Sequence, residues 1–380
     1  MLIYYGIIDN YVKENIESVM EKLKVGLLFG GVSSEHAVSC LSAASIIPNI
    51  PRDEYELLLV GITADGRWLR YDGDVDHIAD DSWHTAAAAR PCFLSPDRSI
   101  HGFVELLEDG STLTHRVDVI FPVLHGKNGE DGTLQGLLMM AGIPFVGCDM
   151  LSSAVCMDKA VANMLMDHAG IRRAEWRFIT KAQRAEREAA FIAECEQALG
   201  YPMFIKPANA GSSVGVSKVR NAAEFAAAIE EAFLHDSKVL AERAIVGKEI
   251  ECAVLGNDKP VASVVGEIAP AEDADFYDYE EKYINGNSSS YIPARVSEEA
   301  AKEMRRIAVE AYQMLGCGGL SRVDFLYETA TGIPYLNELN TLPGFTSISM
   351  YPKLMDASGV PYPELLSRVI RLALERTEEI

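Results

Sequence analysis

Short apolar segments alternate with amphipathic ones in the first third of the 380-residue chain, which limits the folds that it can adopt. Residues 25–29, 55–61 and 117–121 predict buried strands, and residues 33–47 predict a helix between the first two. The polar run 72–97 is expected to be a surface excursion. Strands separated by helices and glycine-rich turns favour an α/β domain built on a parallel sheet.

The turn after the first strand is the first candidate for a ligand site. Gly30-Gly31 lacks the spacing of the GxGxxG dinucleotide fingerprint, so nicotinamide binding is disfavoured. Ser33 or Ser34 is expected to cap the following helix, with Glu35 in its first turn. The loop His125-Gly-Lys-Asn-Gly-Glu-Asp-Gly follows the third strand, and loops at the carboxyl ends of parallel strands share one crevice.

Composition narrows the functional class. The chain is 48% hydrophobic and 24% charged, as is ordinary for a soluble globular protein, and is long enough for two or three domains. A net charge of −22 argues against nucleic acid as a partner but does not exclude ATP. The 7 cysteines form no CxxC pair, which indicates reduced thiols and a cytoplasmic protein. No apolar stretch is long enough to span a bilayer.

Two segments near the C-terminus carry hard oxygen ligands. Arg322 and Asp324 lie in one predicted strand, and Glu338 and Asn340 lie in another. Residues two apart on a strand share a face, so the pairs are in phase. Carboxylate and amide oxygens suit Mg²⁺, with Arg322 as a fixed positive charge beside it. The pattern favours phosphoryl transfer from a nucleotide, and a solvated acidic strand face is the alternative.

The middle of the chain supplies a candidate phosphate site. Residues 201–207 and 214–219 predict two strands joined by a turn of small residues, which is not the strand–loop–helix of a P-loop. Backbone N–H groups in such a turn can bind anions, with Lys206 as a point charge. Glu242 and Glu249 are candidate acceptors for adenine and ribose. The aromatic segment 275–290 is expected to be a mobile lid.

Most of these features lie within eight sequence motifs that occur together in one family: FGGVSSEHAVS, HGKNGEDG, CMDK, IKPANAGSSVGV, FYDYEEKY, SRVDF, NELNTLPGFTS and SMYP. From Lys24 onward the chain resembles the D-alanine–D-alanine ligase family of the ATP-grasp superfamily. The resemblance implies an N-terminal extension at 1–23, an α/β domain at 24–148, and central (149–238) and C-terminal (239–380) subdomains that sandwich ATP. It also implies a cytoplasmic homodimer that makes D-alanyl-D-alanine for peptidoglycan, and thus for the cell wall and cell shape.

The resemblance also implies roles for individual residues. ATP would be bound by Lys159, Lys206, Ser212, Glu242, Ile245, Glu249 and Lys282. Two Mg²⁺ ions, with Mn²⁺ as an alternative, would be bound by Asp324, Glu338 and Asn340. The D-alanine substrates would contact Glu35, His125, Arg322, Ser349 and Met350. Glu35, Ser213 and Tyr283 would form a hydrogen-bonded trio, and Arg322 and the Gly344 N–H would stabilise the oxyanion.

The implied chemistry starts with ATP converting the first D-alanine into an acyl phosphate, which the amine of the second D-alanine then attacks. Tyr283 and the apolar Met350 favour D-alanine as the second substrate. The segments HGKNGEDGTLQG and GCDMLSSAVCMDK resemble the D-serine-specific branch, so D-alanine–D-serine ligase is the first alternative. Another ATP-grasp carboxylate–amine ligase, and a nucleotide-binding regulator without catalysis, are the others.

Overall fold

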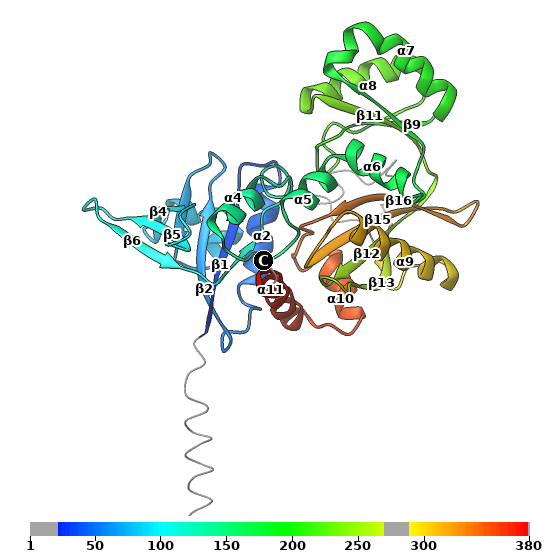
Figure 1. Ribbon diagram of the computed structural model, residues 1–380. Helices are drawn as coiled ribbons and strands as arrows, with labels where there is room; N and C mark the ends of the chain where they lie inside the picture. The colour runs from blue at the N-terminus through cyan, green and yellow to red at the C-terminus, as the bar shows by residue number, and fades with distance from the viewer. Residues whose placement is uncertain (1–21, 270–288, 379–380) are drawn as a thin grey trace, which may run out of the picture.

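The computed structural model describes residues 22–269 and 289–378, and these fold into three sheets with their own helices (Figure 1). Lys282, Tyr283, most of the predicted lid and most of the N-terminal extension lie outside these residues. The three-domain ATP-grasp arrangement expected from the sequence is confirmed: a sheet with parallel pairing is followed by two antiparallel sheets.

The first sheet has seven strands in the order β6-β5-β4-β3-β2-β1-β7. Its centre is parallel, as predicted, because β1 pairs in parallel with both β2 and β7. The strands β3 to β6 extend it with antiparallel pairs that the sequence pattern did not indicate. The elements are β1 (Leu23–Gly30), α2 (His36–Ile46), β2 (Tyr55–Ile62), β3 (Trp68–Tyr71), α3 (Asp76–Ala79), η1 (Trp83–Thr85), β4 (Ala89–Leu94), β5 (Gly102–Leu106), β6 (Thr112–Arg116), β7 (Val119–Pro122) and α4 (Thr133–Ala141).

The run 72–97 is not a surface excursion, so that prediction was wrong. It contains α3, η1 and β4, and Ile78 and Trp83 are completely buried. The Trp83 ring packs so closely on β2 that a Cβ at Gly61 would come within 2.2 Å of it. A few buried apolar residues anchor this segment. The composition of the segment did not indicate them, because many charged residues lie between them.

The start of α2 also differs from the prediction. The helix begins at His36 with Glu35 as its N-cap, and neither Ser33 nor Ser34 caps it with a side chain. Ser33 instead accepts a hydrogen bond from the Glu35 N–H at 3.1 Å through its hydroxyl, and its carbonyl accepts one from the His36 N–H at 3.2 Å. In this turn the Glu35 side chain makes no capping hydrogen bond to the helix.

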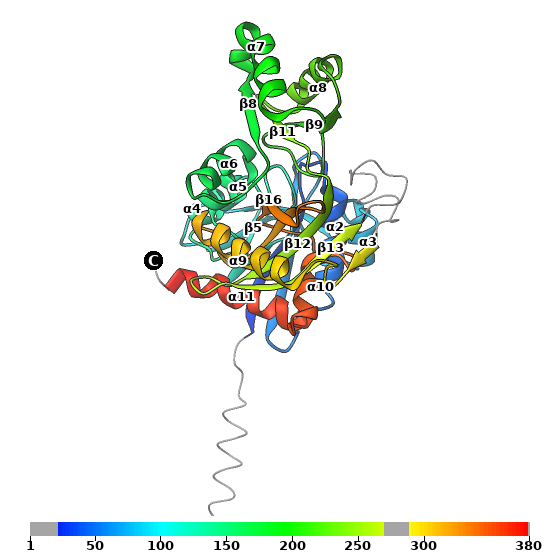
Figure 2. The same ribbon diagram turned by 90° about the vertical axis from the view of Figure 1, so that its right-hand side faces the viewer.

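The central unit is a four-stranded antiparallel sheet in the order β10-β9-β11-β8, covered by α7 and α8. It stands at one end of the molecule in both views (Figures 1 and 2). The predicted strand, turn and returning strand around Lys206 are confirmed as β9 and β10. The elements are α5 (Met150–Met157), α6 (Lys159–His168), β8 (Trp176–Thr180), α7 (Lys181–Leu199), β9 (Met203–Pro207), β10 (Ser217–Val219), α8 (Ala222–His235) and β11 (Lys238–Arg243).

The C-terminal unit is a five-stranded antiparallel sheet in the order β14-β13-β12-β15-β16. Helix α9 packs on one face through Met304, Ile307 and Ala311. The elements are β12 (Gly247–Leu255), β13 (Val261–Ala269), β14 (Ser289–Tyr291), α9 (Glu298–Met314), β15 (Leu320–Glu328), β16 (Ile333–Asn340), α10 (Met350–Ala357) and α11 (Tyr362–Glu378).

Packing between the units differs from a simple division along the chain. Leu365, Val369 and Ile370 of α11 belong to the same buried cluster as Val25 and Leu27 of β1, so the last helix packs on the first domain. Similarly, α5 and α6 contribute to the core beneath β12, β15 and β16, and Ala160 of α6 also packs with Trp176 and Leu240 of the central sheet. Among the described helices, none combines the length and apolar character needed to cross a membrane.

Candidate active site

A cleft of about 420 Å³ is lined by residues of all three units. It brings together every described residue that the sequence singled out except Ile245, which is half-buried in the connection between β11 and β12. The residues brought together are Glu35, His125, Lys159, Lys206, Ser212, Ser213, Glu242, Glu249, Arg322, Asp324, Glu338, Asn340, Gly344, Ser349 and Met350.

The candidate metal ligands converge because β15 and β16 pair as neighbours. Asp324 lies directly opposite Glu338, and Arg322 lies opposite Asn340. The register shifts only after Asp324, on the side of the hairpin turn. Both ligand pairs therefore lie in the regularly paired part of the hairpin, at the end that faces the cleft. The Asn340 amide donates to Asp324 Oδ2 at 2.8 Å. Two carboxylates and an amide oxygen form a donor set that fits Mg²⁺, which takes few carboxylates and completes its shell with water and phosphate.

Arg322 is held by two acidic side chains. Its Nε and Nη2 each donate to a different oxygen of Asp324 at 2.7 Å, and Glu251 on β12 lies 3.2 Å from the same Nε. The Glu251 contact is an ion pair rather than a hydrogen bond, because the Nε proton is directed at Asp324. The guanidinium is therefore fixed beside the metal ligands before substrate arrives.

Two lysines line the cleft from opposite elements. Lys159, the first residue of α6, lies 3.2 Å from Glu338 Oε2 and donates to the Ala210 carbonyl at 2.9 Å. Lys206 on β9 forms an ion pair with Glu242 on β11 at 2.5 Å, and both side chains are only 12% exposed. Buried charges of this kind are stable only when paired. The lysines thus place positive charge over the carboxylates and over the loop that follows β9.

The loop after β9 contacts the N-terminal domain through Ser212. Ser212 Oγ donates to Glu35 Oε1, whereas no such contact is found for Ser213, which had been predicted to face Glu35. Both serines have left-handed φ angles, 49° and 60°, so neighbouring side chains point in different directions. The close approach also depends on Gly126, where a Cβ would lie 2.2 Å from Glu35 Oε2.

His125 lies at the back of the cleft and is 5% exposed. Its Nδ1 is 3.0 Å from the Leu342 carbonyl oxygen, and its Nε2 is 3.2 Å from the hydroxyl of Ser42. Burial alone would lower the pKa of His125, but the carboxylates of Glu130 and Glu35 outweigh it and raise the pKa above its ordinary value. The histidine therefore links the loop after β7 to the segment after β16.

The last part of the cleft is the turn that leads into α10. The Ser349 hydroxyl accepts from the Thr346 N–H at 3.0 Å and lies 2.8 Å from the Thr346 hydroxyl. A Cβ at Gly344 would come within 2.8 Å of Ser349 Oγ, which shows how closely the two residues approach. Met350 is 6% exposed, and its terminal methyl packs on Gly266 of β13. Only a small part of Met350 therefore reaches the cleft.

Sequence reasoning gave no individual role to Glu251, Glu130, Thr346 and Lys353, which also line the cleft, although Glu130 lies in the loop expected to face it. Glu251 left a signal, because Glu249 and Glu251 alternate with the buried Ile250 and Cys252 along β12. Period-two alternation puts both glutamates on one face of a strand. The other three lie in turns or on a helix, where spacing alone does not indicate direction.

Comparisons with known proteins agree with this geometry. A family model described as "D-ala D-ala ligase N-terminus" matches residues 24–148, and one described as "D-ala D-ala ligase C-terminus" matches residues 165–371. A D-alanine–D-alanine ligase of Caldicellulosiruptor bescii is 48% identical over 360 residues, which cover 95% of this chain and 97% of that protein.

Two solved structures are also similar. The D-alanine–D-alanine ligase of Coxiella burnetii is 34% identical with a TM-score of 0.83, covering 94% of this chain and 96% of its own. The VanG D-Ala:D-Ser ligase of Enterococcus faecalis is 43% identical with a TM-score of 0.83, covering 93% and 100%.

Proposed function

This chain belongs to the D-alanine–D-alanine ligase family, and we propose that it joins two D-alanines into D-alanyl-D-alanine through a D-alanyl phosphate, with ATP converted to ADP. The product is a building block of peptidoglycan. The observation that carries the proposal is the meeting of Arg322 and three oxygen ligands with Lys159 and Lys206 in one cleft. Phosphoryl transfer needs this combination of a metal site, phosphate-binding cations and a fixed arginine.

ATP would lie between the central and C-terminal sheets. Lys159 and Lys206 would contact its phosphates together with the small-residue loop that contains Ser212. The adenine and ribose would be bound by Glu242, Ile245 and Glu249. The ion pair between Lys206 and Glu242 supports a site in which Lys206 lies between the phosphates and the adenine. Lys282, a further predicted phosphate ligand, and Tyr283, predicted to face Glu35, remain predictions.

The reaction depends on ATP and a divalent metal. We propose two Mg²⁺ ions, replaceable by Mn²⁺, bound by Asp324, Glu338 and Asn340. When bound, the metal neutralises charge on the transferring phosphoryl group. The residues themselves keep their carboxylates in place through the contacts of Asp324 with Arg322 and of Glu338 with Lys159.

The first D-alanine would bind against the N-terminal domain, with its ammonium facing Glu35 and with His125 nearby. Its carboxylate oxygen attacks the γ-phosphorus of ATP, the bond to ADP breaks, and the acyl phosphate forms. Glu35 is 7% exposed and its carboxylate lies beside the loop over the cleft, so the ammonium would be bound away from bulk water. Exclusion of water protects an acyl phosphate from hydrolysis.

The second D-alanine would bind near Ser349 and Met350. Its neutral amine attacks the acyl carbon, and the negative charge that forms on the carbonyl oxygen is stabilised by Arg322 and the Gly344 N–H. The phosphate then leaves with the oxygen that the first D-alanine supplied, and the attacking nitrogen loses one proton to solvent as the amide forms. Removing one donor to such an oxyanion costs about 2.7–4 kcal/mol.

A matched pair of variants tests the role of the loop. We expect Ser212→Ala to lower kcat/KM for D-alanine roughly 10- to 150-fold, because a hydrogen bond to a charged group contributes about 1.5–3 kcal/mol. Ser213→Ala is the control, since Ser213 has a similar left-handed φ but no contact with Glu35. Steady-state kinetics of both variants show whether Ser212 or Ser213 is the serine that acts with Glu35. A larger loss in Ser213→Ala would restore the residue predicted from sequence.

D-Serine is the competing second substrate, because a D-Ala:D-Ser ligase is among the similar structures. We expect an equimolar mixture of D-alanine and D-serine to give predominantly D-alanyl-D-alanine, since an apolar pocket rejects an added hydroxyl by about a hundredfold. Mass spectrometry of the products measures the ratio. Predominant D-alanyl-D-serine would leave the ligase mechanism intact but contradict the assignment of Met350, and no dipeptide from folded protein would refute the ligase itself.

Two parts of the expectation from sequence remain predictions: a homodimer and a cytoplasmic location. Light scattering coupled to gel filtration tests the first, and fractionation of the source cells tests the second.

A further inference from the structure

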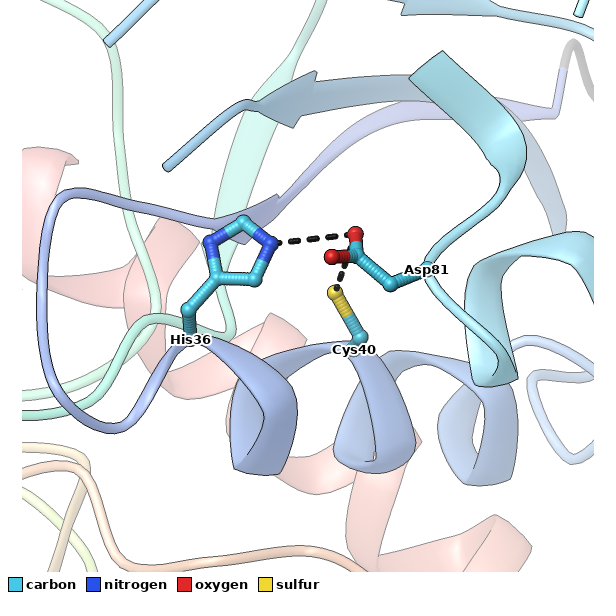
Figure 3. A group of neighbouring side chains, drawn as sticks. All are labelled: His36, Cys40 and Asp81. Carbon is cyan, nitrogen blue, oxygen red and sulfur yellow. Dashed lines mark hydrogen bonds and ion pairs between the residues drawn. The ribbon is translucent and has the colours of Figure 1, made fainter. Parts of the chain in front are cut away.

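Three side chains with metal-binding atoms lie together outside the catalytic cleft (Figure 3). His36 and Cys40 are one turn apart on α2, and Asp81 comes from the segment between α3 and η1. One ligand atom from each residue, a ring nitrogen, the thiol sulfur and a carboxylate oxygen, lies within 4.8 Å of the other two. No step of the proposed reaction uses these residues.

The hydrogen bonds of His36 leave one ring nitrogen directed at Asp81. Nδ1 is 2.8 Å from the Gly31 carbonyl oxygen, which can only accept, so Nδ1 carries a hydrogen. In a neutral ring Nε2 then presents a lone pair, and it lies 3.1 Å from Asp81 Oδ1, a second acceptor. Two acceptor atoms at this distance need a proton or a metal ion between them.

The surroundings hold the imidazole and the carboxylate in these positions. Gly31 orients the ring, and the indole N–H of the buried Trp83 donates to Asp81 Oδ1 at 3.0 Å. Asp81 has a left-handed φ of 61°, which turns its side chain back toward α2. Histidine ligands in metal sites are usually oriented by such a carbonyl, and ligand carboxylates by such a donor. The Asp81 side chain is 44% exposed, which provides a path from solvent.

Cys40 is the ligand that most needs a positive charge nearby. It is 1% exposed, and burial, followed by the charge of Asp81, raises the pKa of its thiol to about 12. Without a metal the side chain is therefore a neutral thiol. A divalent cation would offset the charges of a thiolate and a carboxylate together, and the thiol proton would pass to solvent on binding.

We propose that His36, Cys40 and Asp81 bind one zinc-class divalent cation, with water completing a tetrahedral shell. Usual zinc bond lengths place nitrogen and oxygen ligands about 3.3 Å apart, and oxygen and sulfur ligands about 3.6 Å apart. The corresponding distances here are 3.1 Å for Nε2 and Oδ1 and 3.9 Å for Sγ and Oδ1. Nitrogen and sulfur ligands select zinc or cobalt over Mg²⁺, which distinguishes this site from the all-oxygen set at Asp324.

The position gives the ion a structural consequence. It would tie the first turn of α2, whose N-cap is Glu35, to the segment that buries Trp83. We therefore expect bound zinc to raise the melting temperature of the protein, because a ligand that binds only the folded state stabilises it.

Cobalt titration of the metal-free protein, in the presence of excess Mg²⁺ to occupy the oxygen ligands, tests the site. We expect one Co²⁺ per chain and a thiolate-to-cobalt charge-transfer band in the near ultraviolet, which zinc abolishes by displacement. Cys40→Ser should lose the band. Asp81→Asn, which keeps an acceptor for Trp83 and so protects the fold, should weaken binding at least about tenfold.

Two control variants test whether Cys40 is the cysteine that supplies the thiolate. Cys156→Ser removes a cysteine that lines the catalytic cleft, and Cys195→Ser removes a buried one whose pKa is likewise raised to about 12 by burial. Both should keep the band. The proposal is overturned if the wild-type protein shows no band, if the band survives in Cys40→Ser, if Asp81→Asn binds with unchanged affinity, or if Cys156→Ser loses the band.

Discussion

Replacing Glu338 with glutamine should lower kcat/KM at a fixed Mg²⁺ concentration by about a thousandfold or more. Glu338 lies opposite Asp324 on the neighbouring strand and is 3.2 Å from Lys159. The amide keeps the size of the side chain but removes the charge that a divalent ion requires. Metal stabilisation of a transferring phosphoryl group contributes several kcal/mol, and each 1.36 kcal/mol is tenfold in rate.

The Mg²⁺ dependence separates this effect from general damage. The Mg²⁺ concentration needed for half-maximal rate should rise in Glu338→Gln, while its melting temperature stays near that of the wild-type protein. Glu310→Gln on α9 is the control with the same charge change, since its ion pair with Arg306 is exposed and contributes little to stability. Unchanged kcat and an unchanged Mg²⁺ requirement in Glu338→Gln would remove Glu338 from the metal site.

Replacing Arg322 with lysine should lower kcat by about a hundred- to a thousandfold and change the KM for ATP little. Lysine keeps the positive charge but cannot donate two hydrogen bonds to Asp324 while facing the substrate. The interaction that is lost is the hydrogen bond from the guanidinium to the oxyanion, and one such donor contributes about 2.7–4 kcal/mol. A loss in kcat rather than in KM identifies an interaction made only in the transition state.

Arg295→Lys, in the segment between β14 and α9, provides a matched control. Arg295 also donates to a carboxylate through two nitrogens, with Nε and Nη2 at 3.1 Å and 2.5 Å from the oxygens of Glu267, but it does not line the cleft. We expect the kcat of Arg295→Lys to stay within about threefold of the wild-type value. A rise in KM for ATP with unchanged kcat in Arg322→Lys would instead make Arg322 a binding residue for the nucleotide.

The chemistry of the site could be predicted from sequence where it depends on strand periodicity. Alternation placed Glu338 and Asn340 on one face of their strand, and Arg322 and Asp324 on one face of theirs, and the structure pairs the two strands so that Arg322 lies opposite Asn340 and Asp324 opposite Glu338. The same rule applied to β12 would have found Glu251. Its contact with Arg322, however, depends on which strands are neighbours, and this information lies in the whole sheet rather than in the segment.

Sequence patterns were not sufficient where local geometry or burial decides. Ser212 and Ser213 are adjacent and chemically identical, so only the dihedral angles of the loop show which one reaches Glu35. Trp83 lies in a run rich in charged residues, and its complete burial goes with a close contact between its ring and Gly61 of β2. The position of α11 on the first domain likewise follows from packing between distant segments, which no local pattern encodes.

The most direct test of the acyl phosphate mechanism is to follow the oxygens of the first substrate. The protein is supplied with ATP, Mg²⁺ and D-alanine carrying ¹⁸O in both carboxylate positions, and the released phosphate and the dipeptide are analysed by mass spectrometry. We predict one ¹⁸O atom in each phosphate formed, because the attacking carboxylate oxygen leaves with the phosphoryl group when the amine attacks. Dipeptide formation with unlabelled phosphate would contradict the account.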